Sequence, residues 1–397
     1  FQPIRHSQPH LRTLLVSGSG GGVALGGYHN FSSLSATASD RLETAPTTAD
    51  DIGFWLYSSG STGAPKGAAH LQSDLVQTAV LYGEGVLGIQ ENDVVYSAAK
   101  LFFAYGLGNA MTFPLHVGAT AVLLAERPTP ESVMRTLKKH RPHIFYGVPT
   151  LYAMILADPS LDRSKGSDRL RICVSAGEAL PEDVAHRWVE RFGTDILDGI
   201  GSTEMLHIFV SNQPGDIRYG TTGKPVPGYR ARIVDEEGDD VGPGEVGEHL
   251  VAGPSSAICY WNNRAKSLAT FQGIWTRTGD KYTRDADGYY RYAGRADDML
   301  KVGGIWVSPF EVESALAAHP KVLEAAVVGQ PDADELIKPK AYVVLKGGTA
   351  AAEDLTQELK SFVKDRLAAY KYPRWIEFVG ELPKTATGKI QRFKLRA

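Results

Sequence analysis

A short stretch at residues 57–67 combines residue types that suit the binding of an anion. It reads Tyr-Ser-Ser-Gly-Ser-Thr-Gly-Ala-Pro-Lys-Gly, so hydroxyls and glycines precede a single cation, Lys66. Glycines let backbone N–H groups converge, hydroxyls donate further hydrogen bonds, and the ammonium supplies charge. We expect a strand at 53–59 to lead into this loop and a helix to follow it, which predicts a phosphate clamp. A flexible surface loop is the alternative. A P-loop of the Walker A type is disfavoured, because no Gly-Lys-Ser/Thr occurs at the required spacing.

A second stretch, residues 198–205, places a hydroxyl next to a carboxylate at the end of a glycine-rich turn. Thr203 could donate to a phosphate oxygen and Glu204 could hold Mg²⁺, because hard cations prefer oxygen ligands. The alternative is the cap of a following helix, where Ser or Thr often occurs with Glu.

Two further patterns carry charged residues. Asp280 ends the stretch 275–280, and Arg295 follows in a Gly-Arg-Ala-Asp-Asp-Met run; together they could bind a ribose diol. The alternatives are an Asx turn for Asp280 and a surface salt bridge for Arg295. Near the end of the chain Lys389 lies between Thr/Gly residues and could be catalytic or simply solvated.

The elements that must position these residues alternate between two periodicities. Apolar or β-branched runs predict strands, and helical patterns occur between some of them, which indicates a layered α/β domain with largely parallel strands. The expected strands are 93–99, 119–124, 143–148, 171–177 and 231–235, and the expected helices are 73–87 (capped by Ser73), 130–140 and 149–158.

The residue composition and the predicted secondary structure change twice along the chain. Glycine-rich turns and short strands between 215 and 293 predict a β-rich subdomain, so that residues 1–296 form one large domain. Residues 297–397 predict a small second domain of mixed α+β structure. Its expected helices are 308–319 and 352–367, and its expected strands are 322–329, 338–345 and 374–380.

Composition narrows the class of protein. With 397 residues the chain is long enough for two or more domains, and its net charge of −3 gives no basic field for nucleic acid. Cys173 and Cys259 lie too far apart for a disulfide framework or zinc motif, and we expect both to be buried in a reducing cytoplasm. No apolar run approaches the length of a membrane span, and no signal-peptide pattern opens the chain. The chain begins at Phe1 without a methionine, so we expect that an N-terminal portion is missing.

The order of the motifs resembles the acyl-adenylate-forming superfamily, which comprises acyl-CoA ligases, adenylation domains of peptide synthetases, and luciferases. The resemblance covers essentially the whole chain and is carried by five motifs, at 57–67, 201–204, 278–280, 294–298 and 383–389. Within the superfamily the chain is most similar to aryl-CoA ligases of the benzoate-activating type. That closer similarity is carried by the stretches 100–120, 198–209 and 303–313.

The resemblance implies an enzyme with two half-reactions that uses ATP, Mg²⁺ and CoA. An aromatic carboxylate, first of all benzoate, attacks the ATP α-phosphate, and CoA then displaces AMP from the acyl-AMP. By family position Lys66, Thr203, Glu204 and Lys389 are the catalytic residues, with Glu204 holding the metal and Lys389 bridging the carboxylate and the phosphate. The nucleotide-binding set implied is Ser58, Ser59, Gly60, Ser61, Thr62, Gly63, Lys66, Gly177, Glu178, Ala179, Asp198, Gly199, Ile200, Gly201, Ser202, Thr203, Asp280, Arg295 and Lys389.

The second domain is implied to be a mobile lid that rotates about Asp297. The rotation would withdraw Lys389 and bring a CoA-channel loop over the site, with Lys301, Gly303, Gly304 and Trp306. The acyl pocket implied consists of Ala104, Tyr105, Gly106, Gly201, His207 and Ile208. No lysine or arginine is evident in these runs, which disfavours diacids, and we expect His207 to be a packed histidine. For Phe102, Phe103 and Tyr105 ordinary core packing is the alternative.

Other functions remain open at this point. The chain could load an amino acid onto a carrier protein, or it could be a truncated nucleotide-binding remnant without activity. A P-loop ATPase is a third, weaker alternative. Relatives in the superfamily carry more than a hundred residues before the region where this chain starts, commonly including part of a homodimer surface.

Overall fold

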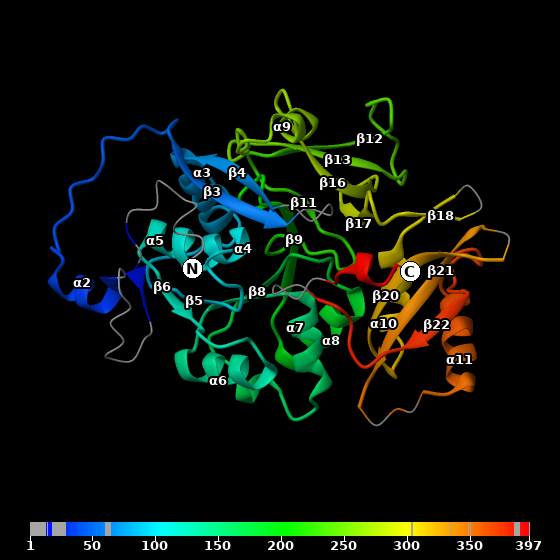
Figure 1. The fold of residues 1–397 in the computed structure, drawn as a ribbon. Helices are drawn as coiled ribbons and strands as arrows, with labels where there is room; N and C mark the ends of the chain where they lie inside the picture. The colour runs from blue at the N-terminus through cyan, green and yellow to red at the C-terminus, as the bar shows by residue number, and fades with distance from the viewer. Residues whose placement is uncertain are drawn as a thin grey trace. The chain divides into compact units, whose positions relative to one another are not determined.

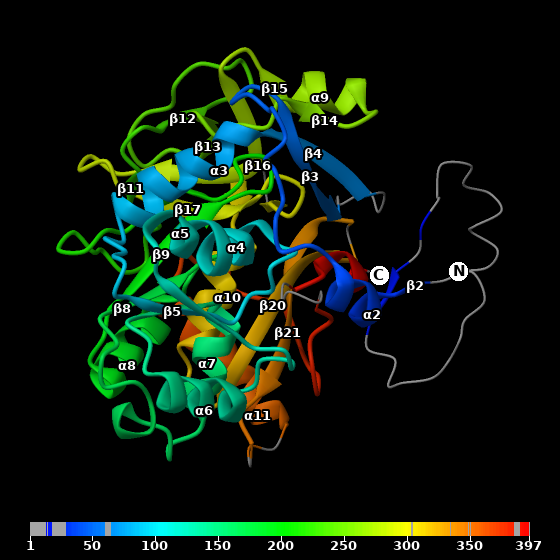
Figure 2. The same cartoon turned by 90° about the vertical axis from the view of Figure 1, so that its left-hand side faces the viewer.

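The computed structural model describes most of the chain. The described residues are 13, 15–17, 29–59, 65–302, 305–333, 335–347, 349, 351–384 and 390–396, without the side chains of Ser59 and Trp306. Contacts between residues divide the chain into two units, Phe1–Thr48 and Ala49–Ala397. Figure 1 and Figure 2 show the chain in two views, coloured from blue to red along the sequence.

The first unit contains little regular structure. Strand β1 (Leu15–Val16) pairs in parallel with β2 (His29–Asn30), and helix α2 (Phe31–Thr37) follows directly. The side chain of Asn30 caps α2 by accepting from the Ser33 N–H at 3.0 Å. No residue of α2 is buried, and the site residues named above all belong to the second unit.

A seven-stranded sheet forms the centre of the second unit. Its strand order is β11-β10-β9-β8-β7-β5-β6. Five strands run parallel: β5 (Val94–Ser97), β6 (Thr120–Leu123), β7 (Ile144–Gly147), β8 (Ile172–Ser175) and β9 (Ile196–Gly201). The other two, β10 (Ile208–Ser211) and β11 (Lys224–Pro225), are antiparallel. The predicted layered α/β architecture is confirmed.

Helices cover both faces of this sheet (Figure 1, Figure 2). One layer consists of α3 (Gln72–Thr78), the π-helical turn η1 (Ala79–Glu84), α4 (Ala104–Leu107), the π-helical turn η2 (Gly108–Thr112) and α5 (Phe113–Val117). The other consists of α6 (Pro130–His140), α7 (Pro149–Ala157) and α8 (Glu182–Phe192). Alternate residues of β7 therefore enter different cores: Ile144 packs in the first and Phe145 in the second.

The helix expected at 73–87 differs in its start and its end. It begins at Gln72 with Leu71 as N-cap, so Ser73 does not cap it. Instead the Asp74 carboxylate accepts from the Leu71 N–H at 3.1 Å. The sequence predicted a helix that extends beyond Thr78 because η1 continues the chain with π-helical hydrogen bonds. The periodicity of apolar residues does not distinguish such a segment from an α-helix.

The described residues on either side of 60–64 form two strands, and not a strand and a helix as expected. Strand β3 (Ile52–Ser59) pairs antiparallel with β4 (Pro65–Leu71), and β4 pairs with β14 (Cys259–Tyr260). A P-loop needs a strand followed by a helix, so this hairpin rules out the ATPase alternative. Cys173 is buried as predicted, whereas Cys259 is only half-buried.

The region 215–293 contains short strands and turns, as its sequence indicated. A second sheet is built from β12 (Arg230–Val234), β13 (Gly247–Ala252), β15 (Phe271–Gln272), β16 (Trp275–Arg284) and β17 (Tyr290–Arg295). Helix α9 (Arg264–Thr270) connects β14 to β15. The long strand β16 is central, since it pairs with β13, β15 and β17.

The C-terminal part has its own sheet and its own core. Strands β20 (Val322–Pro331), β21 (Ile337–Leu345) and β22 (Trp375–Phe378) pack with α10 (Pro309–Ala317) and α11 (Glu353–Lys364). A small hairpin of β18 (Leu300–Val302) and β19 (Ile305–Val307) precedes them. Two short 3-10 turns, η3 (Arg163–Lys165) and η4 (Arg392–Lys394), complete the described elements. The domain boundary at 296/297 stays a prediction.

A membrane span would need a long apolar helix, and the described part of the chain contains none.

Candidate active site

Lys66 and Glu204, 138 residues apart in sequence, meet at the centre of the candidate site. The hairpin places Lys66 at the start of β4, and its Nζ lies 3.4 Å from Glu204 Oε1. The hydroxyl of Tyr260, from the neighbouring strand β14, donates to the same carboxylate oxygen at 2.6 Å. Lys66 Nζ also lies 3.0 Å from that hydroxyl and 4.6 Å from the centre of the Tyr260 ring. The three side chains form one connected group.

This group keeps Glu204 ionised. Burial would raise the pKa of the Glu204 carboxyl, but the charge of Lys66 and the hydrogen bond from Tyr260 outweigh it, and the net shift of the pKa is downward. The same contacts raise the pKa of Tyr260, through burial first and then through the adjacent carboxylate. At neutral pH the site therefore holds a carboxylate, an ammonium and a neutral phenol.

The turn that carries Thr203 and Glu204 is held from several sides. The Glu204 carbonyl accepts from the Ala257 N–H at 2.8 Å, and the Met205 carbonyl accepts from the Ser255 hydroxyl at 2.7 Å. Leu206 has a φ of +65°, a conformation that a branched side chain adopts only when its surroundings impose it. Strand β10 follows the turn, so the alternative of a helix cap is wrong.

Asp280 and Arg295 are directly opposite each other on β16 and β17. Arg295 Nη1 donates to Asp280 Oδ1 at 2.9 Å; the aspartate is buried and the arginine is exposed. The pKa of Arg295 is raised, first by the charge of Asp280 and in part by that of Glu204. Arg295 therefore does form a salt bridge, which was the alternative given for it above. It also places both residues within electrostatic reach of the Lys66 group.

The predicted adenine-binding stretches lie on neighbouring strands. Asp198 is buried on β9 beside Ser175 of β8, and burial raises the pKa of its carboxyl well above the usual value. Gly177 follows β8 with a φ of +96°. Glu178 accepts a hydrogen bond at 3.0 Å from the backbone N–H of Ile390, which directly follows the predicted catalytic lysine in the sequence.

Two of the predicted acyl-pocket residues, Tyr105 and Gly201, lie against His207. Its ring lies against Tyr105, with the ring centres 5.7 Å apart, and against Phe113 at 4.5 Å. Burial lowers the pKa of His207 to about 3, so the ring is neutral, as expected for a packed histidine. The Tyr105 hydroxyl donates to the carbonyl oxygens of Gly147 and Val174, so this residue can offer a ligand only its ring.

Glycine is required at two places beside this histidine. A Cβ on Gly201 would lie 2.5 Å from the His207 carbonyl oxygen, and one on Gly108 would lie 2.4 Å from the His207 ring. Core packing was the alternative for Phe102, but this side chain is 66 % exposed and does not lie in the core. Ala104, Tyr105 and Gly106 lie on α4, and Ile208 is buried on β10.

Several predicted site residues lie outside the described residues. They are Gly60, Ser61, Thr62, Gly63, Gly303, Gly304 and Lys389, together with the side chains of Ser59 and Trp306. Ser58 is described and pairs across the hairpin with Lys66. Lys301 lies exposed on β18, and the carbonyl of Asp297 accepts from Arg396 Nη2 at 3.1 Å. The remaining predicted residues, Ala179, Gly199, Ile200 and Ser202, lie in or beside β8 and β9.

Sequence reasoning missed three residues of this region. Tyr260 belongs to no motif, so no signal could have found it. His70 and Asp74 are both fully buried, and because His70 lies on a strand and Asp74 on the following helix, no regular spacing in the sequence predicted their contact.

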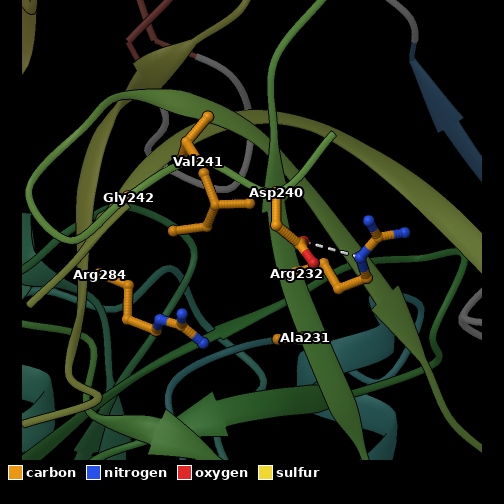
Figure 3. A pocket seen from close by; sticks show the side chains of 7 residues that line it. Ala231, Arg232, Asp240, Val241, Gly242 and Arg284 are labelled. Atoms are coloured by element: carbon orange, nitrogen blue, oxygen red, sulfur yellow. Dashed lines mark hydrogen bonds and ion pairs between the residues drawn. The ribbon is translucent and has the colours of Figure 1, made fainter. Parts of the chain in front are cut away.

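The described residues contain no cluster of three or more His, Cys, Asp or Glu side chains that could hold a metal by themselves. A hollow in the second sheet, between Arg232, Asp240 and Arg284, contains none of the predicted site residues (Figure 3). The Asp240 carboxylate there is paired with Arg232 at 2.8 Å.

Comparison with known proteins gives consistent matches. The family described as "AMP-binding enzyme" matches residues 10–261, and "AMP-binding enzyme C-terminal domain" matches residues 311–389. A benzoate–CoA ligase of Thauera aromatica is 63 % identical, over 100 % of this chain and 74 % of its own length. A benzoate CoA ligase structure from Burkholderia xenovorans LB400 has a TM-score of 0.90 and 54 % identity, covering 99 % of this chain and 81 % of that one. An anthranilate CoA ligase, AuaEII, in complex with anthranoyl-AMP has a TM-score of 0.94 and 49 % identity, covering 99 % and 75 %.

Proposed function

The chain belongs to the AMP-binding enzyme family, and on that premise we propose that it converts benzoate to benzoyl-CoA. It is an AMP-forming acid–thiol ligase that uses ATP, Mg²⁺ and CoA and releases AMP and pyrophosphate. The observation that carries this function is the 63 % identity with a benzoate–CoA ligase over the full length of the chain. The neutral, aromatic surroundings of His207 support an uncharged planar ring as the acyl group.

In the first half-reaction a benzoate oxygen attacks the α-phosphorus of ATP and pyrophosphate leaves. Two anions meet, so stabilisation of charge on the phosphate oxygens dominates the barrier. We assign the hairpin loop with Ser58 and Lys66 to the β- and γ-phosphates, and Thr203 to the α-phosphate. Lys389 would bridge the two reacting groups.

Glu204 fits a magnesium ion that is also bound by phosphate. Mg²⁺ at nucleotide sites is commonly held by one or two protein carboxylates, with substrate oxygens and water as the other ligands. Glu204 meets that need because its lowered pKa keeps it ionised. The ion would neutralise charge on the phosphates.

The nucleoside is assigned to the remaining charged and strand-end residues. Asp280 would accept from the ribose hydroxyls while Arg295 holds the carboxylate in place. The adenine would lie between the backbones of 177–179 and 198–200. Burial raises the pKa of Asp198 well above its usual value, so we assign this residue to the shape of the pocket and not to a negative charge in it.

In the second half-reaction the CoA sulfur attacks the acyl carbon and AMP leaves. We propose that residues 297–397 rotate about Asp297, which moves Lys389 away and brings Lys301 and Trp306 toward the CoA channel. The bond from the Ile390 N–H to Glu178 supports assigning the arrangement described here to the first half-reaction.

One experiment tests the activity directly. A panel of carboxylic acids is scored for pyrophosphate release with CoA present and absent, and thioester formation is measured in parallel. We expect benzoate to give the highest kcat/KM, with thioester formed only when CoA is present. Activity only with a carrier protein, or pyrophosphate release independent of any aromatic acid, would refute the proposal.

Two further properties belong to this proposal. Dependence on ATP and CoA supports a cytoplasmic site of action, and a homodimer is our expectation for the assembly. Light scattering at micromolar concentration, which measures mass directly, tests the second point.

A further inference from the structure

Behind the proposed phosphate site lies a buried pair of ionisable residues that the mechanism above does not use. His70, on β4, and Asp74, in α3, are both fully buried. His70 Nδ1 lies 2.8 Å from Asp74 Oδ2, and the ring stacks on Phe54 with the ring centres 5.3 Å apart. The other ring nitrogen, Nε2, lies 2.8 Å from the carbonyl oxygen of Thr203.

These contacts define one proton position and the orientation of the ring. A carbonyl oxygen only accepts, so Nε2 must carry a proton that it donates to Thr203. On the other side, Asp74 Oδ2 lies 2.8 Å from Nδ1 and also accepts from the Leu71 N–H at 3.1 Å. Asp74 therefore holds the ring in the orientation that points Nε2 at Thr203.

The bond to Thr203 acts on the peptide that joins the two proposed phosphate and metal residues. The Thr203 carbonyl and the Glu204 N–H belong to one rigid peptide unit, so rotation of that unit moves both side chains. The internal bond of the turn, from the Leu206 N–H to the Thr203 carbonyl, is long at 3.3 Å. Because Leu206 is held at φ +65°, the turn needs support from outside it.

We propose that His70 is a positioning residue: held in its orientation by Asp74, it fixes the Thr203–Glu204 peptide for the adenylation half-reaction. This inference rests on the proposed function. His70 touches neither the reacting atoms nor the metal in this scheme, and acts through the carbonyl of Thr203. The pair connects the hairpin with Lys66 to the turn with Glu204, and so holds both ends of the Lys66–Glu204 contact.

Two substitutions of the same residue separate this role from simple stability. In His70→Asn the amide can replace Nδ1 and keep the bond to Asp74, but nothing reaches Thr203. In His70→Gln the longer amide can replace Nε2 and donate to Thr203, while the buried Asp74 loses its contact with the ring and keeps only the hydrogen bond from the Leu71 N–H.

We expect the variant with the lower thermal stability to have the higher activity. His70→Gln should have the lower Tm of the two but keep benzoate-dependent pyrophosphate release within about threefold of the unsubstituted enzyme. His70→Asn should have the higher Tm, yet lose at least tenfold in that rate and require more Mg²⁺ for half-maximal activity. Its thioester half-reaction, started from supplied benzoyl-AMP and CoA, should be unchanged. Activity that follows the order of Tm, or full activity in His70→Asn, overturns the proposal.

A spectroscopic measurement tests the proton on Nε2 without any turnover. In protein labelled with ¹⁵N at histidine, Nε2 of His70 should show the chemical shift and one-bond N–H coupling of a protonated ring nitrogen. His70→Asn, which has no ring, should lose this signal and so assigns it. An unprotonated Nε2 in the unsubstituted protein refutes the inference even if the ligase activity is present.

Failure of the proposed function would look different. If no aromatic acid promotes pyrophosphate release, the ligase assignment fails. The NMR signal and the affinity for MgATP in His70→Asn then still decide the role of His70, with at least tenfold weaker binding expected. Unchanged MgATP affinity in that case overturns it.

Discussion

At the scale of single residues, the charge of Glu204 depends on Lys66. Burial alone would push the pKa of this carboxyl upward, and the ammonium at 3.4 Å is the largest of the effects that hold it below its usual value. The carboxylate is therefore present above that lowered pKa and is lost only as the pH falls through it. Metal binding by Glu204 should persist well into the acid range.

Replacing Lys66 by Met should move this titration. Without the ammonium, the largest of the effects that oppose burial is lost, so the pKa of Glu204 rises and the carboxylate is protonated at a higher pH. We expect the acid limb of the pH–rate profile for pyrophosphate release to shift upward, in addition to a lower maximum rate. Lys224→Met, which removes a surface lysine paired with Asp216, is the matched control and should leave the profile unchanged. An unshifted acid limb in Lys66→Met would show that Glu204 is not the titrating group.

Asp280 offers a second test at this scale. Asp280→Asn should weaken ribose binding and lower kcat/KM for ATP by about 10- to 100-fold, since hydrogen bonds to charged groups contribute about 1.5–3 kcal/mol. The loss should lie mainly in KM for ATP, with KM for benzoate unchanged. Asp168→Asn is the control, because Asp168 forms a similar but exposed pair with Arg141. A selective rise in KM for benzoate would contradict the assignment.

At the scale of elements, the close approach of β9 to the turn before β10 limits which residues can occupy the proposed acyl pocket. The backbone of His207 lies so near Gly201 that any side chain there forces the two strands apart. The register of β9 and β10 already shifts between Ile208 and Val210, so this is the part of the sheet where a displacement would spread to the pocket.

Gly201→Ala should therefore be costly. A Cβ at 2.5 Å from a backbone oxygen must displace backbone, which we expect to reduce the free energy of unfolding by about 1–3 kcal/mol. Activity with benzoate should fall further than stability does, since His207 moves with its carbonyl. Denaturant unfolding and the pyrophosphate assay measure the two effects. Gly380→Ala, at a position with nothing within 4 Å of the added Cβ, should change neither; a neutral Gly201→Ala would contradict the close approach.

At the scale of the whole molecule, the two proposed half-reactions need different placements of residues 297–397. In the arrangement described here, the Ile390 N–H is bonded to Glu178, while Arg392 is paired with Glu313 and Asp298 within the C-terminal part. In the proposed rotation the ion pairs of Arg392 move together with the C-terminal part. The hydrogen bond from Ile390 to Glu178, in contrast, must break when that part rotates.

Proline at the hinge should separate the two half-reactions. Asp297→Pro restricts φ at the proposed pivot, so we expect benzoyl-AMP formation to stay within about threefold while thioester formation falls at least tenfold. Pyrophosphate release and benzoyl-CoA formation, followed separately in single-turnover experiments, measure the two steps. Asp297→Ala removes the same side chain without restricting φ and should affect neither step. Comparable losses in both steps of Asp297→Pro would argue against a hinge at this residue.

The sequence by itself determined the fold class, the alternation of helices and parallel strands, and the nucleotide motifs, because hydrophobic period and glycine-rich turns are local signals. It also indicated that His207 would be packed rather than catalytic. The strand between the loop and the helix that begins at Gln72 was missed, since β4 is stabilised by pairing with β3 and with β14, nearly two hundred residues later. Only the tertiary structure decided which polar groups meet: the Tyr260 hydroxyl with Glu204, and His70 with the Thr203 carbonyl. Contacts between distant segments depend on strand order and register, and no local spacing in the sequence encodes those.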